Sequence, residues 1–342
     1  MKLIECVANI SEGSDTSVIQ EVANAAKDNG ALILDIDSGR SAGRSVITFA
    51  APLELMKGAA VAFIKSATTL IDMRKHQGVH PCIGAADVCP FVSLGESTLQ
   101  DCALLAEEVA KEVGNNLKIP TFLYGVTPSG ATKTKLSNIR RGGYQGLLKR
   151  IKDKEITPDF GPSEVGSAGG TIIGARLPML AYNINLANDN VEAAKVIAAK
   201  LRGSGSLKRD PAGKVIKDAS GTPLREAGMF PNCEAIGWYI EDFKRAQIST
   251  NLRQIGDPPL HIIYEAAAKL AKSLDCTVTG SEIIGLIPLR ALLEGEKYYK
   301  NGGVEDTDNF TAAIAGLGLR DVKSFVASEK ILEYRLRAFG IF

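Results

Sequence analysis

Histidine, cysteine and tryptophan are scarce in this sequence of 342 residues, which contains three, six and one of them. The cysteines are scattered, and no two of them form a C-x-x-C pair. In a chain of this length such spacing argues against a disulfide framework and indicates reduced, mostly buried thiols.

The chain also lacks an excess of charge and a long apolar run. Its 40 lysines and arginines nearly balance its 39 aspartates and glutamates, whereas a nucleic-acid-binding protein usually carries a basic excess. No window approaches the ~18–20 apolar residues of a membrane span, and Glu5 interrupts the apolar core that a signal peptide would need. We therefore expect a cytoplasmic protein that binds neither nucleic acid nor a membrane.

The order of predicted elements occurs twice along the chain. Apolar periodicity predicts the pattern strand, helix, strand, strand, helix, strand in each half. The strands are expected at 3–10, 31–37, 44–50 and 88–92 and again at 179–186, 235–240, 246–251 and 277–279, with helices at 17–28, 52–71, 190–202 and 259–274. This order is typical of a ferredoxin-like βαββαβ unit. The sequence therefore predicts an α+β fold of two domains, 1–178 and 179–342, with a cleft between them as the usual place for a ligand.

Other segments give weaker signals. Pro90 within the fourth strand predicts an edge strand or a bulge, since proline cannot donate to a sheet ladder. A helix is expected at 97–114 and a short strand at 120–125, and 126–178 reads as polar and loop-rich with a basic helical stretch around 140–154. Residues 203–232 read as a long structureless insertion that is functional or mobile.

The stretch from His76 to Phe91 contains two of the three histidines. Helical spacing would let His76 and His80 share a metal ion, but Pro81 directs His80 away from helical backbone. Besides the shared metal ion, two interpretations of His80 remain. His80 either makes structural hydrogen bonds only, or serves as an acid–base group held in a rigid loop.

Two aspartates are candidates to orient His80. Asp37 lies at the end of the second predicted strand, beside a Ser-Gly turn, and Asp87 lies between the histidines and the fourth strand. In a βαββαβ unit the end of the second strand can approach the loop before the fourth, so Asp37 is a candidate to orient His80 and Asp87 is its competitor. A turn-forming role is the alternative for Asp37.

The glycine-rich stretch 159–170 is either a flexible linker or a loop whose backbone N–H groups bind an anion. Arg44 and Arg176 carry the planar guanidinium that suits carboxylates, or are surface charges. Asn183 and Asn185 share one face of their predicted strand, where they either satisfy a buried network or meet a ligand.

Several ordered blocks of the sequence resemble glutamate formiminotransferase. The resemblance extends from the first strand to about residue 295. The blocks that carry it are Glu5-Cys-Val-x-Asn-x-Ser-Glu-Gly13, Asp35-x-Asp37-x-Gly39, Leu70-Ile-Asp-Met73, His76-x-Gly-x-His80-Pro, Gly84-Ala-x-Asp-Val-Cys-Pro-Phe91, Leu123-Tyr-Gly125, Pro158-Asp-Phe-Gly-Pro-Ser163, Tyr182-Asn-Ile-Asn-Leu186 and Ile236-Gly-Trp-Tyr239.

That resemblance implies two tandem ferredoxin-like subdomains with a folate tunnel between them, a homodimer, and no metal. The reaction it implies transfers a formimino group from N-formimino-L-glutamate to tetrahydrofolate, a co-substrate, giving 5-formiminotetrahydrofolate and L-glutamate in histidine degradation. In animals this domain is fused to a cyclodeaminase, and we expect that second activity to be absent here. The resemblance matches His80 to the catalytic histidine and Asp37 to its acidic partner. It also matches the folate-binding loop to Gly161, Pro162, Ser163, Glu164, Val165, Gly166, Ser167, Ala168, Gly169 and Gly170.

Three other functions remain open. A related transferase would use 5-formyltetrahydrofolate and glutamate at the same site. A metal-dependent hydrolase would use His76, His80 and Asp87 as ligands. A folate-binding protein without catalysis would need none of the three as an acid or base.

Overall fold

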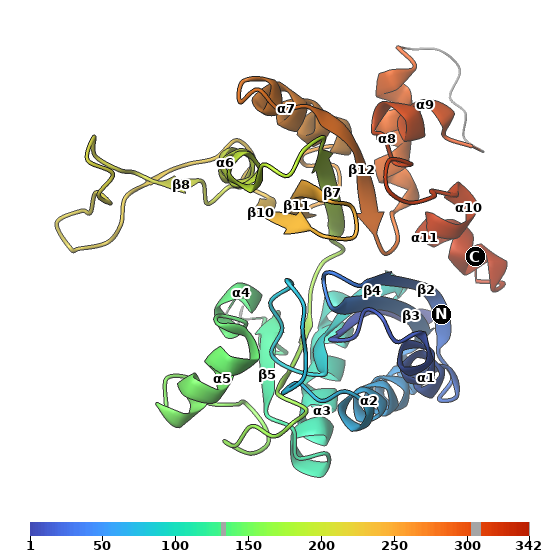
Figure 1. The fold of residues 1–342 in the computed structure, drawn as a ribbon. Helices are drawn as coiled ribbons and strands as arrows, with labels where there is room; N and C mark the ends of the chain where they lie inside the picture. The colour runs from blue at the N-terminus through green and yellow to red at the C-terminus, as the bar shows by residue number, and fades with distance from the viewer. Residues whose placement is uncertain (131–134, 302–308, 342) are drawn as a thin grey trace. The chain divides into compact units, whose positions relative to one another are not determined.

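The computed structural model describes residues 1–130, 135–301 and 309–341. They form two compact units, Met1–Leu177 and Pro178–Phe342. Each unit combines a β-sheet with helices, so the predicted α+β class is confirmed (Figure 1). No helix among the described residues is long and apolar enough to cross a membrane.

The first unit contains a six-stranded sheet in the order β2-β3-β1-β4-β6-β5. Neighbours among the first four strands are antiparallel, whereas β6 runs parallel to both β4 and β5. The strands are β1 Lys2–Ile10, β2 Leu32–Gly39, β3 Arg44–Pro52, β4 Ala86–Gly95, β5 Thr121–Gly125 and β6 Thr171–Ala175. The helices are α1 Thr16–Lys27, α2 Leu53–Leu70, α3 Leu99–Asn116, α4 Leu136–Ile139 and α5 Gly143–Lys152.

Helices cover both faces of this sheet. Alternate residues of β1, such as Ile4 and Ile10, are fully buried in a core that also holds apolar side chains of α1, α2 and α3. On the opposite face, Phe122 and Ile172 belong to a second cluster with Leu147 of α5. Helix α1 begins with a side-chain cap, since Asp15 accepts hydrogen bonds from the backbone N–H groups of Ser17 and Val18.

The second unit repeats the element order of the first four strands. Its sheet has the order β10-β11-β7-β12, and every pair is antiparallel. The strands are β7 Leu180–Leu186, β10 Cys233–Ile240, β11 Arg245–Leu252 and β12 Val278–Ile284. The helices are α6 Val191–Leu201, α7 Leu260–Lys272, α8 Leu289–Tyr299, α9 Thr311–Gly316, α10 Ala327–Lys330 and α11 Leu332–Ala338.

Of the two alternatives predicted at Pro90, the edge strand is wrong, whereas the β1–β4 register does shift nearby, between Asn9↔Val88 and Ile10↔Ala86. Strand β4 lies inside the sheet, because β6 pairs with it on the side away from β1. Sequence reasoning missed β6, which it placed in a loop-rich region. The missing N–H of proline is accommodated within the ladder instead: the β1–β4 pairs go directly from Asn9↔Val88 to Cys6↔Phe91.

Residues 203–232, here called the arm, are not structureless as the sequence predicted. Their stem is a two-stranded pair, β8 Ser206–Leu207 and β9 Arg225–Glu226. Two small loops follow inside the stem, closed by the bridges Arg209↔Val215 and Lys217↔Pro223. Figure 1 shows the arm, in yellow, projecting from the second unit.

Three backbone hydrogen bonds join the stem and the two loops of the arm. Ile216 N donates to Lys208 O, Leu224 N donates to Ile216 O, and Lys208 N donates to Leu224 O, each at 2.9 Å. The three residues are eight apart, and each loop repeats an Asp-x-x-Gly turn, at Asp210 and at Asp218. The arm is therefore a three-way junction of hairpins.

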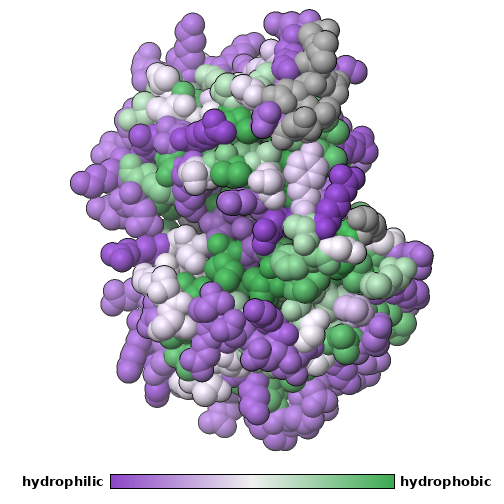
Figure 2. Space-filling model, turned by 90° about the vertical axis from the view of Figure 1, so that its right-hand side faces the viewer, coloured by the Kyte–Doolittle hydropathy of each residue, from purple (hydrophilic) through white to green (hydrophobic). Residues whose placement is uncertain are grey.

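The surface visible in Figure 2 is mixed, with hydrophilic side chains over most of it and hydrophobic ones between them. Large apolar side chains that are exposed, such as Val79, Leu104 and Ile262, are spread over several elements. Single exposed apolar residues of this kind are normal for a folded protein.

Candidate active site

The loop that carries His80 is attached to the turn between β2 and β3. Val79 N donates to Ser41 O at 3.1 Å, and His80 N donates to Ala42 O at 3.3 Å. The two segments approach so closely that Gly43, with a φ of +63°, has no room for a side chain. A Cβ there would lie 2.5 Å from the carbonyl oxygen of Gln77. The sequence of this turn therefore fixes the position of the histidine.

Arg44, the first residue of β3, contacts the His80 ring directly. Its Nη1 lies 2.6 Å from His80 Nε2. A guanidinium only donates hydrogen bonds, so Nε2 is the acceptor and a neutral ring carries its proton on Nδ1. Burial lowers the pKa of His80 well below 6.5, and the positive charges of Arg44 and Arg140 and the nearby His76 lower it further. His80 is therefore held neutral.

Burial also lowers the pKa of Arg44, to about 10, and the positive charge of Arg140 acts in the same direction. The carboxylates of Asp87 and Asp37 oppose that effect. Asp37 lies two residues before Gly39, the residue of β2 that pairs with Arg44, so both side chains project from one face of the sheet. The structure thus places Asp37 beside the arginine, and its predicted contact with His80 stays a prediction.

Asp87, the alternative orienter, has other partners. One carboxylate oxygen accepts a hydrogen bond from Ile83 N at 2.7 Å, and the other forms an ion pair with Arg140. Asp87 is fully buried and the Arg140 side chain is 13% exposed. Sequence reasoning missed Arg140, which follows α4. The only signal for it was the basic stretch around 140–154.

His76 makes a separate contact. Its Nδ1 donates to the backbone oxygen of Ser11 at 3.1 Å, which fixes the ring against the end of β1. Across residues 1–130, 135–301 and 309–341, no three side chains of His, Cys, Asp or Glu form a group that could hold a metal ion.

The predicted folate loop has an attached half and an exposed half. Ser167 and Ala168 accept backbone hydrogen bonds from Met73 and Ala85, each at 2.8 Å, and Gly170 N donates to Ile83 O at 3.0 Å. Ala168, Gly169 and Gly170 are buried. Residues 161–167 are exposed or half-buried instead. The attached half thus joins this loop to the one that carries His80.

Asn183 and Asn185 lie in a hydrogen-bonded network on the sheet of the second unit. Asn183 Nδ2 donates to Glu282 at 3.1 Å, and Asn185 Nδ2 donates to Asp321 at 2.9 Å. Gln247, on the neighbouring strand, donates to both Asn185 and Glu282 at 2.8 Å. Of the two alternatives weighed for these amides, a buried network is what the described residues form.

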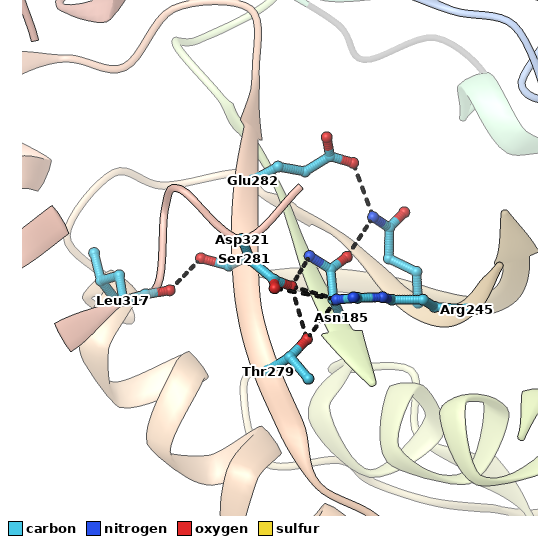
Figure 3. Close-up of polar contacts among 8 residues, drawn as sticks. Asn185, Arg245, Thr279, Ser281, Glu282, Leu317 and Asp321 are labelled. Carbon is cyan, nitrogen blue, oxygen red and sulfur yellow. Dashed lines mark hydrogen bonds and ion pairs between the residues drawn. The ribbon is translucent and has the colours of Figure 1, made fainter. Parts of the chain in front are cut away.

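The network continues to the segment after α9 (Figure 3). Arg245 pairs with Asp321 at 2.9 Å, and Thr279 donates to the same carboxylate at 2.7 Å. Sequence reasoning missed Gln247, Glu282 and Asp321, because they are distant in the sequence and meet only across the sheet. Arg176 belongs to the first unit. It donates to the backbone oxygen of Leu177 at 3.0 Å.

The fold and the half-buried histidine–arginine pair define an α+β protein with a candidate acid–base site. The chain belongs to the formiminotransferase domain family. The N-terminal subdomain of that domain matches residues 3–176, and the formiminotransferase domain matches residues 181–337. The resemblance inferred from the sequence blocks is therefore confirmed.

Named relatives agree with this assignment. The chain is 35% identical over 309 residues to a glutamate formimidoyltransferase of Streptococcus pyogenes, covering 90% of this chain and 95% of that protein. It is 37% identical over 302 residues to a glutamate formimidoyltransferase of Thermoplasma acidophilum, covering 87% and 92%. It is 36% identical over 339 residues to the formimidoyltransferase-cyclodeaminase of Rattus norvegicus, of which it spans 60%.

Proposed function

We propose that this protein transfers the formimino group of N-formimino-L-glutamate to tetrahydrofolate. The observation that carries the proposal is His80, a half-buried neutral histidine on a rigid loop, in a member of the formiminotransferase domain family. The relatives from Streptococcus and Thermoplasma, which the alignments cover over nearly their whole length, support it by their names.

In the proposed reaction, N5 of tetrahydrofolate attacks the formimino carbon, and His80 takes the N5 proton. The C–N bond to glutamate then breaks while His80 returns the proton to the departing nitrogen. The lowered pKa keeps His80 neutral before the reaction, and it makes the imidazolium a good acid afterwards. Asp37 would fix the tautomer and support the imidazolium.

The remaining predicted residues take binding roles in this proposal. The exposed half of the loop, 161–167, would contact the folate, and Arg44 and Arg176 would contact carboxylates. Asn183 and Asn185, which the hydrogen-bonded network holds in place, would contact the substrate.

The proposal extends to the organisation of the molecule. Each unit would be a ferredoxin-like domain, 1–178 and 179–342, and the strand orders β2-β3-β1-β4 and β10-β11-β7-β12 support this. We also propose that the protein is a cytoplasmic homodimer.

A spectrophotometric assay of 5-formiminotetrahydrofolate formation tests the activity. His80→Ala should lose at least ~10²-fold in turnover while tetrahydrofolate binding is largely retained. His261→Ala is the matched control, because His261 stacks on Tyr298 in the second unit and has no assigned role. A wild-type protein without transfer activity would contradict the proposal.

The same assay separates the formyl alternative. The wild type would be offered 5-formyltetrahydrofolate with glutamate in parallel with the formimino donor. Faster turnover of the formyl donor would replace the proposed reaction with formyl transfer. Unchanged transfer by His80→Ala would remove His80 from either mechanism.

A further inference from the structure

Arg44 covers the nitrogen of His80 that a base would use. The 2.6 Å contact occupies the lone pair of Nε2, and a charged guanidinium has no lone pair to accept a proton in its place. While this contact lasts, Nε2 cannot take a proton from a substrate. The other ring nitrogen carries the proton of the neutral ring and is therefore no base either.

The ring nitrogen of His80 is a weaker partner for the Arg44 guanidinium than a carboxylate would be. An imidazole offers one neutral acceptor, whereas a carboxylate offers two charged oxygens that match the guanidinium fork. Arg44 is half-buried close to a second positive charge, Arg140, and Asp87 already has Arg140 and Ile83 N as partners. An incoming carboxylate would therefore be a stronger partner for Arg44 than His80 is.

We propose that Arg44 is a cover that the substrate removes: a carboxylate of the amino-acid substrate draws the guanidinium away from His80 Nε2 and so exposes the base. This inference rests on the proposed function, since it requires a substrate derived from glutamate. It makes Arg44 a positioning residue that acts through His80. Proton transfer then begins only when the amino-acid substrate is bound.

The charged neighbours of the ring determine what removal of the cover does. Arg44 comes from β3, Arg140 follows α4, and His76 lies on the same loop as His80. Asp37, Asp87 and Cys82 also act on Arg44. When the guanidinium moves away, one positive charge leaves the ring, so the basicity of His80 rises.

Histidine-ring NMR tests this inference without turnover. The protein has three histidines, so a His80→Gln variant assigns the His80 signals directly. The titration of His80 would be recorded with and without L-glutamate, the proposed product, in wild type and in Arg44→Gln. In wild type, glutamate should raise the pKa of His80 by at least about one unit.

The variants supply the second half of the test. In Arg44→Gln the pKa of His80 should already be raised in the free protein, and glutamate should not raise it further. Arg74→Gln is the matched control: Arg74 is exposed on the same loop and pairs with Asp72, so its loss should leave the His80 titration unchanged.

Three results would overturn the inference: glutamate that binds without shifting His80, glutamate that does not bind at all, or an Arg44→Gln variant whose free His80 titrates as in wild type. The transfer assay is independent of these signals. A glutamate-dependent shift in a protein without transfer activity would support the cover and refute the proposed reaction, so the two failures are distinguishable.

Discussion

Gly43 offers a direct test of how the turn between β2 and β3 positions His80. In Gly43→Ala the new Cβ would lie 2.5 Å from Gln77 O and 2.9 Å from Gly78 Cα, both backbone atoms of the histidine loop. Ordinary contacts of a Cβ are at 3.4 Å or more, so the loop must move by roughly 1 Å. A misplacement of about 1 Å can cost about 10²-fold in rate. The φ of +63° adds a backbone cost of about 1–2 kcal/mol.

Gly213→Ala is the matched control for that backbone cost. Gly213 has a φ of +81° on the arm, and a Cβ there would meet no atom within 4 Å. Both variants would be compared with wild type in the transfer assay, with folding checked by circular dichroism. Gly43→Ala should lose about 10²-fold in kcat/KM, and Gly213→Ala should retain wild-type activity. A Gly43→Ala variant that folds and turns over like wild type would refute the argument that the turn sets the position of His80.

Two further predictions concern the stability of the first unit. Burial and Arg44 hold the pKa of His80 below 6.5 in the folded protein, so the unfolded chain takes up that proton first as the pH falls. The free energy of unfolding should therefore decrease below about pH 6.5 by up to ~1.4 kcal/mol per pH unit. His80→Gln should remove that slope in urea denaturation between pH 5 and 7; an unchanged slope would refute the assignment. Asp87→Ala would leave Arg140 buried without its ion-pair partner and should cost about 3–5 kcal/mol in the same measurement. Glu96→Ala, which loses an exposed pair, should leave the midpoint unchanged, and equal midpoints for both variants would contradict the reasoning.

Local rules in the sequence predicted most of the elements. Apolar periodicity over 17–28 predicted α1, which the structure begins at Thr16. The apolar pattern at 3–10 and 44–50 likewise predicted β1 and β3, because it acts between residues that are close in the sequence. Strand β6 was not predicted, because its five residues follow a glycine-rich loop and its partners β4 and β5 are distant in the sequence. The wrong expectation of an edge strand at Pro90 followed from that omission.

The candidate site was predictable only where one residue carries the chemistry. His80 was identified from the glycine and proline around it. The contact between Arg44 and His80, 36 residues apart, depends on how one turn packs against one loop, and no periodicity encodes it. The pairing of Asp87 with Arg140 likewise joins segments separated by one strand, β5, and two helices, α3 and α4.

The three-way junction in the arm has a consequence for how its length can vary. Either loop can be removed as a block of eight residues, 209–216 or 217–224, without changing the pairing of the stem. If 209–216 is removed, the contact of Lys208 with Leu224 continues directly into the pair Lys217↔Pro223. If 217–224 is removed, the contact of Lys208 with Ile216 continues into Arg209↔Val215. In both cases the branched arm would become an unbranched hairpin in register, so the chain length of the arm can change by eight residues without a change in the pairing of its stem.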